Sequence, residues 1–373
     1  MPFQCNYYVT VRCNQRCLFC NIPHTSNGSA AREPTLEQVR ANLHDLRRLG
    51  VKILDITGGE PLLYRHLVEM LTLAKEMGFT TSVTTNGMLY PRYAEQLAGK
   101  VDALLFSLDS TDPDEHDRIR AMKSFHKTTA AIRLARRLKQ IPYISHVVTD
   151  DAMPHIPKME KLAAELGAIL YLNPCFSFFG NPGISAENAK ALEKYYGRKN
   201  VVVDLAQLRH VAAGGNDTKD PVCQASSSTV VISPHNDLWL PCYHFKQQGI
   251  PIQNNLYELY HSEPVRAVQE MEGKYDFCQG CTVYCYMRGS LARKYPVESA
   301  RMLFHYGKER MRKRIEIWTG GVDGPTEPEL VDTPAPARSK ALPVLSADAH
   351  AHAPHPSLTD LGIAAVRPSF ESE

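Results

Sequence analysis

Long apolar runs are missing from this sequence of 373 residues, and no stretch approaches the roughly 20 apolar residues that a membrane-spanning helix needs. The first five residues also lack the basic and apolar regions of a secretory signal peptide. We therefore expect a cytoplasmic protein with no membrane span. In that reducing compartment the ten cysteines are expected to be metal ligands or buried thiols rather than a disulfide framework.

An excess of charge of one sign is missing as well. The 42 basic and 40 acidic residues give a formal net charge of +2, so there is no electrostatic reason to expect a nucleic-acid partner. The hydrophobic share of 43% argues against a wholly disordered chain. A chain of this length can form a large core and two domains.

Short β-rich runs alternate with helical patterns over the first 175 residues or so, which favours an α/β fold with a parallel sheet and helical crossovers, either doubly wound or a partial barrel. Thr35 and Gln38 have the spacing of a capping box at the start of the first helix. In either fold, functional groups belong at the carboxyl ends of the strands. The expected strands cover 7–11, 53–57, 81–85, 104–108, 144–148 and 169–172, and the expected later helices cover 66–77, 90–97, 125–138 and 157–166.

Cys13, Cys17 and Cys20 follow the first expected strand with the spacing C-x3-C-x2-C. Three thiolates from one loop are one fewer than a closed tetrahedral iron–sulfur or zinc site requires. This pattern indicates a metal centre with an open coordination position. The alternatives are a structural zinc knot and a four-thiolate electron carrier with a distant fourth ligand.

A second set of cysteines follows a Gly/Asn-rich break at 214–216. Four thiolates are enough for a closed 4Fe-4S cluster, so one of the five is expected to be spare, with Cys281 and Cys285 as the candidates. A zinc-ribbon-like structural knot is the alternative. The set comprises Cys223, Cys242, Cys278, Cys281 and Cys285.

The first cysteine motif resembles the signature of the radical S-adenosylmethionine (SAM) superfamily, C-x3-C-x-aromatic-C, with Phe19 in the aromatic place. In that family the three thiolates hold a 4Fe-4S cluster whose fourth iron is chelated by SAM. Later segments are similar to the family's GGEP, TNG, SLD and HD-x-I-R segments, and each follows an expected strand or opens the next helix. The resemblance implies SAM contacts at Gly58, Gly59, Glu60, Pro61, Thr84, Asn86, Ser107, Asp109 and Arg120.

Two of these residue types suit their expected roles chemically. Paired glycines permit a close backbone approach, and the Glu60 carboxylate can accept hydrogen bonds from the ammonium group of SAM. His116, in the HD-x-I-R-like segment, titrates near neutrality in its ordinary state, which invites a catalytic role. Its place at an acid-rich helix start favours a structural role instead.

The second cysteine set resembles the auxiliary-cluster domains called SPASM and Twitch. The resemblance implies a partial (β/α)6 radical SAM barrel over 1–198 and an auxiliary-cluster domain with a closing helix over 199–320. The Pro/Ala-rich composition beyond Gly320 predicts a disordered tail over 321–373. Two features depart from a full SPASM domain, which has seven cysteines for two clusters and a glycine where this chain has Asp237. Asn236 before it can still accept left-handed dihedrals, so we expect the hairpin to form.

As a member of this family, the chain is expected to cleave SAM reductively to a 5'-deoxyadenosyl radical, which abstracts hydrogen from the substrate. We expect the first strand to begin at about Gln4 and no leader-binding domain to precede it. This favours a small metabolite or cofactor precursor over a peptide or protein substrate. Flavodoxin or ferredoxin is the expected low-potential electron donor, and an electron-transfer protein without SAM chemistry is the alternative of another class.

Overall fold

The computed structural model describes residues 1–20, 22, 32–176, 183–242 and 248–319. The predicted disordered tail over 321–373 lies outside the described residues and stays a prediction. Within the described part, no helix combines the length and the hydropathy that crossing a membrane requires.

One ten-stranded sheet organises the described residues, in the order β10-β9-β8-β1-β2-β3-β4-β5-β6-β7. Strands β1 to β7 are all parallel to their neighbours. They run in sequence order with no reversal, which is the arrangement of a barrel rather than of a doubly wound sheet. Their bounds are β1 Gln4–Thr10, β2 Ile53–Gly58, β3 Thr80–Thr85, β4 Ala103–Ser107, β5 Pro142–Val148, β6 Ile169–Pro174 and β7 Val201–Val203.

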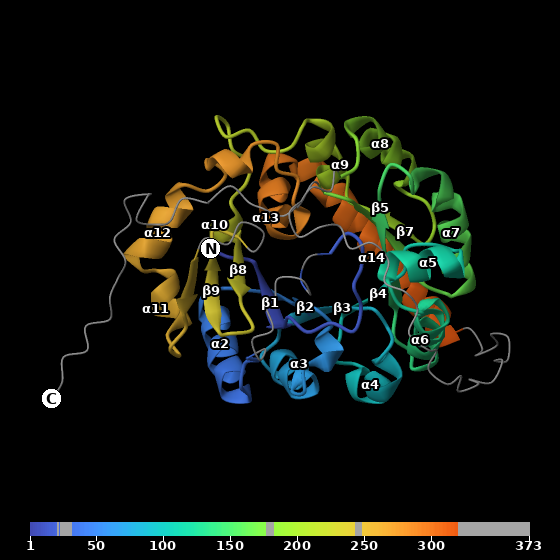
Figure 1. The fold of residues 1–373 in the computed structure, drawn as a ribbon, viewed down its shortest axis with the longest axis horizontal. Helices are drawn as coiled ribbons and strands as arrows, with labels where there is room; N and C mark the ends of the chain where they lie inside the picture. Colours follow the sequence, from blue (N-terminus) through green and yellow to red (C-terminus); the bar gives the residue numbers. More distant parts are fainter. Residues whose placement is uncertain (21, 23–31, 177–182, 243–247, 320–373) are drawn as a thin grey trace, which may run out of the picture.

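The sheet curves but does not close, since β7 and β10 are its edges among the described strands (Figure 1). The predicted partial barrel is thus confirmed, and its strands lie within a few residues of the expected ranges. The capping box is present, with the Thr35 hydroxyl accepting from Gln38 N (3.2 Å) and Gln38 Oε1 accepting from Thr35 N (2.9 Å). It opens the first crossover helix where the sequence predicted it.

Helices follow the strands along the chain, and several of them cover the outer face of the curved sheet (Figure 1). They are α2 Leu36–Arg48, α3 Leu67–Glu76, α4 Tyr90–Leu97, α5 Pro113–Arg120, α6 Phe125–Arg137, α7 Ile156–Glu165, α8 Ala186–Ala191 and α9 Leu205–Ala212. Short 3-10 turns lie at η1 Pro61–Leu63, η2 Met153–His155 and η3 Leu192–Tyr195.

The two faces of the sheet differ in burial. Outward side chains such as Leu54 and Ile56 are fully buried under the helices. The alternate side chains of the same strand, including Asp55 and Thr57, stay partly exposed, and the pattern repeats in β3, β4 and β6. Solvent therefore reaches the inner face, unlike the packed layers of side chains that fill a closed eight-stranded barrel. The solvent-accessible space along this face is called the chamber.

The C-terminal part extends the same sheet. Strand β8 Thr229–Ile232 pairs in parallel with β1, and β9 Asp237–Leu240 returns antiparallel to β8, followed by β10 Gln248–Pro251. The domain boundary at 198/199 stays a prediction, because β7 to β10 all belong to the one sheet. The other elements are α10 Ala225–Ser228, α11 Leu256–Tyr260, α12 Glu263–Glu270, η4 Asp276–Cys278, α13 Tyr284–Lys294 and α14 Pro296–Thr319.

Asn236 makes the turn between β8 and β9 with a φ of 64°, the left-handed conformation expected of it. Its side chain is buried and adds bonds that glycine could not supply. The amide Nδ2 donates to the Ile252 carbonyl (2.8 Å), and Oδ1 accepts from Asn42 Nδ2 (2.7 Å). The hairpin is thereby tied both to the segment after β10 and to α2.

We expect Asn236→Gly to destabilise the protein by about 1–3 kcal/mol, because it leaves buried polar partners unsatisfied while keeping the backbone freedom. Urea denaturation measures this change. Asn254→Gly is the matched control, since Asn254 is also left-handed (φ 58°) but exposed, and should change stability by less than about 0.5 kcal/mol. Equal effects of the two substitutions would show that backbone conformation alone matters at 236.

Candidate functional site

The first cysteine loop lies at the carboxyl end of β1, against the end of α5. Two of its backbone amides donate to that helix, Leu18 N to the Ile119 carbonyl (3.0 Å) and Arg16 N to the Arg120 carbonyl (3.4 Å). Cys17 is 7% exposed, whereas Cys13 and Cys20 are half-buried. Burial raises the pKa of Cys13 to about 11. A metal centre held by this thiol would therefore displace a proton on binding.

Gly58 and Gly59 bring the end of β2 against this loop. A Cβ atom on Gly59 would lie 2.1 Å from the Arg12 carbonyl oxygen, and one on Gly58, whose φ is +141°, would lie 2.2 Å from that of Thr10. The paired glycines thus allow the end of β2 to approach the backbone of Thr10 and Arg12 closely. Their contact with SAM stays a prediction.

Glu60 connects the GGEP-like segment to the segment after β3. Its Oε1 accepts from Leu62 N (3.1 Å) and from the Thr85 hydroxyl (2.7 Å), and its Oε2 accepts from Asn86 N (2.8 Å). Burial nevertheless raises the pKa of this carboxyl group, which is 1% exposed. The sequence predicted an acceptor for the SAM ammonium here. Protein donors already hold both oxygens, so Glu60 also positions its neighbours.

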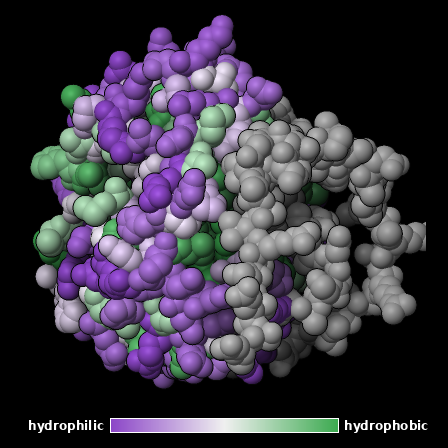
Figure 2. Space-filling view, turned by 90° about the vertical axis from the view of Figure 1, so that its left-hand side faces the viewer, coloured by the Kyte–Doolittle hydropathy of each residue, from purple (hydrophilic) through white to green (hydrophobic). Residues whose placement is uncertain are grey.

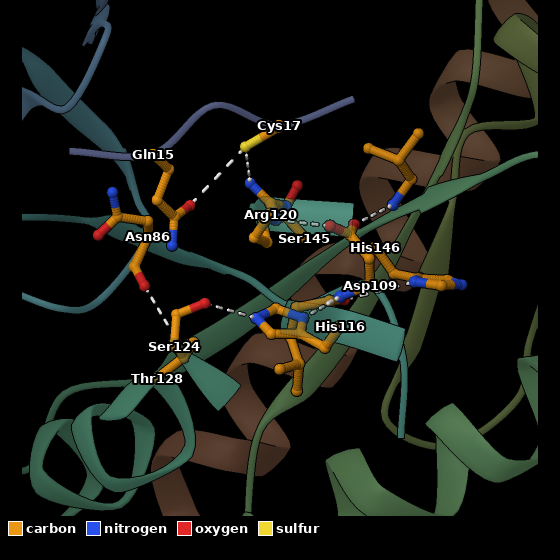
Figure 3. A network of polar contacts seen from close by, with 12 residues as sticks. Gln15, Cys17, Asn86, Asp109, His116, Arg120, Ser124, Thr128, Ser145 and His146 are labelled. Carbon is orange, nitrogen blue, oxygen red and sulfur yellow. Dashed lines mark hydrogen bonds and ion pairs between the residues drawn. The ribbon is translucent and has the colours of Figure 1, made fainter. Parts of the chain in front are cut away.

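Asn86 joins the strand ends to the cysteine loop. Its Nδ2 donates to Asn14 Oδ1 (2.6 Å). Its carbonyl oxygen accepts from the Thr128 hydroxyl (2.8 Å) (Figure 3). Asn14 and Gln15 were missed by sequence reasoning. The signal available was their place inside the C-x3-C loop, where a polar side chain must either bond the loop or face its ligand.

A buried ion pair links three of the motifs. Arg120 Nε lies 2.6 Å from Asp109 Oδ2, and its Nη1 lies 3.5 Å from Cys17 Sγ (Figure 3). Its Cζ lies 5.4 Å from the centre of the Phe19 ring. The structure therefore brings Phe19, Cys17, Asp109 and Arg120 together as the motif order suggested. Arg120 thus places a positive charge beside one of the three cysteines of the motif.

The remaining predicted contact residues divide by exposure. Thr84 in β3 and Ser107 in β4 lie on the inner face of the sheet and are partly exposed toward the chamber. Pro61 opens η1 directly behind Glu60 and is buried. The hydroxyl groups of Thr84 and Ser107 are thus available to a ligand. Pro61 instead helps to fix the backbone conformation at the start of η1.

His116 has a structural role, as the sequence favoured. Its Nδ1 accepts from the Asp109 backbone N–H (3.2 Å), which leaves Nε2 as the donor to the Ser124 hydroxyl (3.2 Å) (Figure 3). Burial, and after it the nearby Arg120 cation, lower the pKa of His116 to about 4. The neutral ring thus supports the backbone of Asp109, the partner of Arg120.

Four of the five later cysteines line one apolar cavity, together with aromatic side chains that include Tyr275 and Tyr286. The four are Cys223, Cys242, Cys278 and Cys281. Among the described residues, no three His, Cys, Asp or Glu side chains converge as ligands of one metal ion. These four thiols are thus grouped because they line the same cavity, and not because they are arranged as ligands of a single metal ion.

Cys285 is not among the cavity-lining residues. Its pKa is raised to about 12 by burial and, after that, by the negative charge of Asp55 on the inner face of β2. Its carbonyl accepts from Asn6 Nδ2 in β1 (3.3 Å). These neighbours place Cys285 on the barrel side of α13. Cys281 and Cys285 were the two candidates for the spare thiol. Cys281 lines the cavity, whereas Cys285 does not.

These features define the class of protein as an open α/β barrel with a candidate thiolate metal site at the carboxyl ends of its strands. Residues 7–198 match the Radical SAM superfamily, and the chain belongs to this superfamily. Family membership confirms the resemblance found in the motifs, the expected enzyme class and the cofactor pair of SAM and a 4Fe-4S cluster.

Similar curated proteins carry several different names. The chain is 31% identical over 166 residues to the AdoMet-dependent heme synthase of Methanosarcina barkeri, covering 44% of this chain and 47% of the relative. It is 34% identical over 166 residues to the probable GTP 3',8-cyclase of Thermoplasma volcanium, covering 43% and 50%. It is 31% identical over 175 residues to the PqqA peptide cyclase of Ruegeria pomeroyi, covering 46% of each. The chain thus spans about half the length of these relatives.

Solved structures with the same fold cover more of the chain. Streptococcus suis SuiB bound to S-adenosylmethionine has a TM-score of 0.60 at 18% identity, covering 75% of this chain and 71% of SuiB. Native anSMEcpe with bound AdoMet has a TM-score of 0.57 at 17% identity, covering 85% and 99%. At these identities the likeness establishes the fold, including its continuation beyond residue 198.

The neutral state of His116 gives a pH prediction. Because its folded-state pKa lies below the ordinary 6.5, its contribution to stability is present above pH 6.5 and is lost as the pH falls toward 4. Between pH 7 and pH 5 this loss should amount to about 2 kcal/mol. His116→Asn should therefore show a flatter decline of unfolding free energy in urea denaturation. His155→Gln, at an exposed histidine, should keep the wild-type slope; an unchanged slope in His116→Asn would contradict the assignment.

Proposed function

We propose that Cys13, Cys17 and Cys20 hold a 4Fe-4S cluster whose fourth iron is left for SAM. The carrying observation is that the cysteine loop, the Gly58–Gly59 turn and the Asp109–Arg120 pair meet at the carboxyl ends of β1, β2 and β4. The donor set suits the cluster, because it offers three soft thiolates and lacks the fourth that a closed site would have.

When bound, these cofactors supply the one-electron cleavage of SAM and a carbon-centred radical that takes hydrogen from the substrate. The chain's own residues position them. Arg120 lies beside Cys17 and its charge is balanced by Asp109, so the cysteine loop has a neighbouring cation that is not left unpaired. Thr84 and Ser107 offer hydroxyls to SAM from the inner face of the sheet.

Contacts of SAM with Gly58, Gly59, Glu60 and Asn86 are part of the same proposal. These residues form one bonded unit at the ends of β2 and β3, next to the cysteine loop. Such a unit holds polar groups in place before a ligand binds, which lowers the cost of ordering them.

We propose a small organic substrate, with a peptide or protein as the alternative. The names of the relatives span heme synthesis, GTP cyclisation and peptide cyclisation, so descent from a common ancestor leaves the substrate open. The inner face favours a compact polar ligand, since Ser82, Ser145 and Asn173 point into the chamber and remain partly exposed. An electron-transfer protein would have no use for this chamber. Flavodoxin or ferredoxin is the proposed electron donor.

We further propose an auxiliary 4Fe-4S cluster held by the four cysteines that line the apolar cavity. A closed set of four thiolates needs no external ligand, so this cluster would differ from the first in having no position for SAM. The cavity lies beside α13, whose Tyr286 lines it and shares a hydrogen bond with the Tyr8 hydroxyl of β1 (2.6 Å).

Cys17→Ala should abolish the formation of 5'-deoxyadenosine from SAM and dithionite, because the first cluster loses one of its three ligands. The product is measured by liquid chromatography of anaerobic reactions. Cys5→Ala is the matched control, since Cys5 packs in the hydrophobic core away from both cysteine sets and should leave the reaction in place. Undiminished 5'-deoxyadenosine from Cys17→Ala would refute the proposal.

The auxiliary ligand set is tested by iron content. Reconstituted Cys281→Ala should contain about four irons fewer than the wild type, whereas Cys285→Ala should contain the full amount, because only Cys281 is a proposed ligand. Anaerobic iron and sulfide analysis measures both. If Cys285→Ala lost about four irons and Cys281→Ala lost none, Cys285 would be the ligand and Cys281 the spare thiol.

A further inference from the structure

A chain of hydrogen bonds fixes an arginine at the chamber. Asp204 caps α9, and its Oδ1 accepts from Ala206 N (2.9 Å) and Gln207 N (3.1 Å). Its Oδ2 accepts from the Tyr284 hydroxyl of α13, and Arg288 Nε in turn donates to that hydroxyl (3.2 Å). The Arg288 guanidinium also lies over the Tyr284 ring, with its Cζ 5.0 Å from the ring centre. Its orientation is therefore set by two elements.

Arg288 faces the inside of the barrel. The charged and polar groups around it are Tyr284, Tyr171, Asp55 and Asp204, and two of them, Asp55 in β2 and Tyr171 in β6, belong to the inner face of the sheet. The side chain of Arg288 nevertheless remains partly exposed. Figure 1 shows α13, which carries it, beside the space enclosed by the curved strands.

The terminal nitrogens of Arg288 have no protein partner in the part of the chain that the structure describes. Among the described residues, Arg288 makes one hydrogen bond, from its Nε to the Tyr284 hydroxyl, and no carboxylate forms an ion pair with it. Asp204 is occupied by the helix cap and Tyr284, and Asp55 accepts from the Ser82 hydroxyl (2.6 Å). The negative charges of Asp55 and Asp204 favour the charged form of Arg288, but neither carboxylate accepts a hydrogen bond from it. The N–H groups of its terminal nitrogens therefore remain free to donate to a ligand.

We infer that Arg288 binds a carboxylate group of the substrate, an inference that rests on the proposed function of the chamber. The two terminal nitrogens of a guanidinium match the two oxygens of a carboxylate in a bidentate pair. The charge favours a singly charged group, because this one cation already lies near Asp55 and Asp204. A nucleoside triphosphate would place several negative charges beside these carboxylates. The chamber should thus reject the substrate class named for the GTP 3',8-cyclases.

Phenylglyoxal, a reagent selective for arginine, tests this inference on the anaerobically reconstituted chain with SAM and without reductant. Peptide mass spectrometry should find an adduct on Arg288, and benzoate at about twice its dissociation constant should slow its formation about threefold. Benzamide, which has the same shape without the charge, should give no protection. Arg120 is the internal control and should stay unmodified, because it is buried and paired with Asp109.

An unreactive Arg288, or equal protection by benzoate and benzamide, would overturn the inference. Protection by GTP or by inorganic phosphate that exceeds the effect of benzoate would overturn the carboxylate class. The measurement involves no SAM cleavage, so its failure is distinguishable from failure of the proposed function. A chain that cleaves SAM but leaves Arg288 unprotected by benzoate would retain the first proposal and lose the second.

Discussion

The buried ion pair between Arg120 and Asp109 is the interaction on which the candidate site depends. It holds the guanidinium beside Cys17, and the same end of α5 binds the backbone of the cysteine loop. Removing one partner of such a pair leaves an uncompensated buried charge, at a cost of about 3–5 kcal/mol. His116, neutral and bonded to the Asp109 backbone, adds support without adding charge. The site is thus built around one cation that is balanced before any ligand enters.

The open barrel gives this site its setting. Its outer face is buried under helices, while its inner face keeps hydroxyl, amide and carboxylate groups in contact with solvent. Parallel strands end at one edge, so the loops after β1 to β4 converge on the chamber. α13 carries both Cys285 and Arg288, and each lies near Asp55 of β2, so the C-terminal part of the chain contributes side chains to the inner side of the barrel.

Much of the fold was predictable because its signals are local. Alternating strand and helix patterns, the capping box at Thr35 and the left-handed turn at Asn236 are all written in neighbouring residues, and each forms as predicted. The motif order also indicated which loops meet. Contacts between distant residues were not predictable. Examples are the bond from Asn86 to Asn14 and the pairing of β8 with β1, since each depends on how loops and strands pack.

The sequence by itself determined the family, the parallel barrel and the two sets of cysteines, because spacing within a motif fixes which ligands one loop can offer. Only the tertiary structure decided which neighbours each of these groups contacts. It showed that the paired glycines accommodate the carbonyls of Thr10 and Arg12, and that four cysteines line one cavity while Cys285 lies outside it. It also set Arg288 inside the barrel. Burial and partner choice depend on residues far apart in the chain, which spacing cannot express.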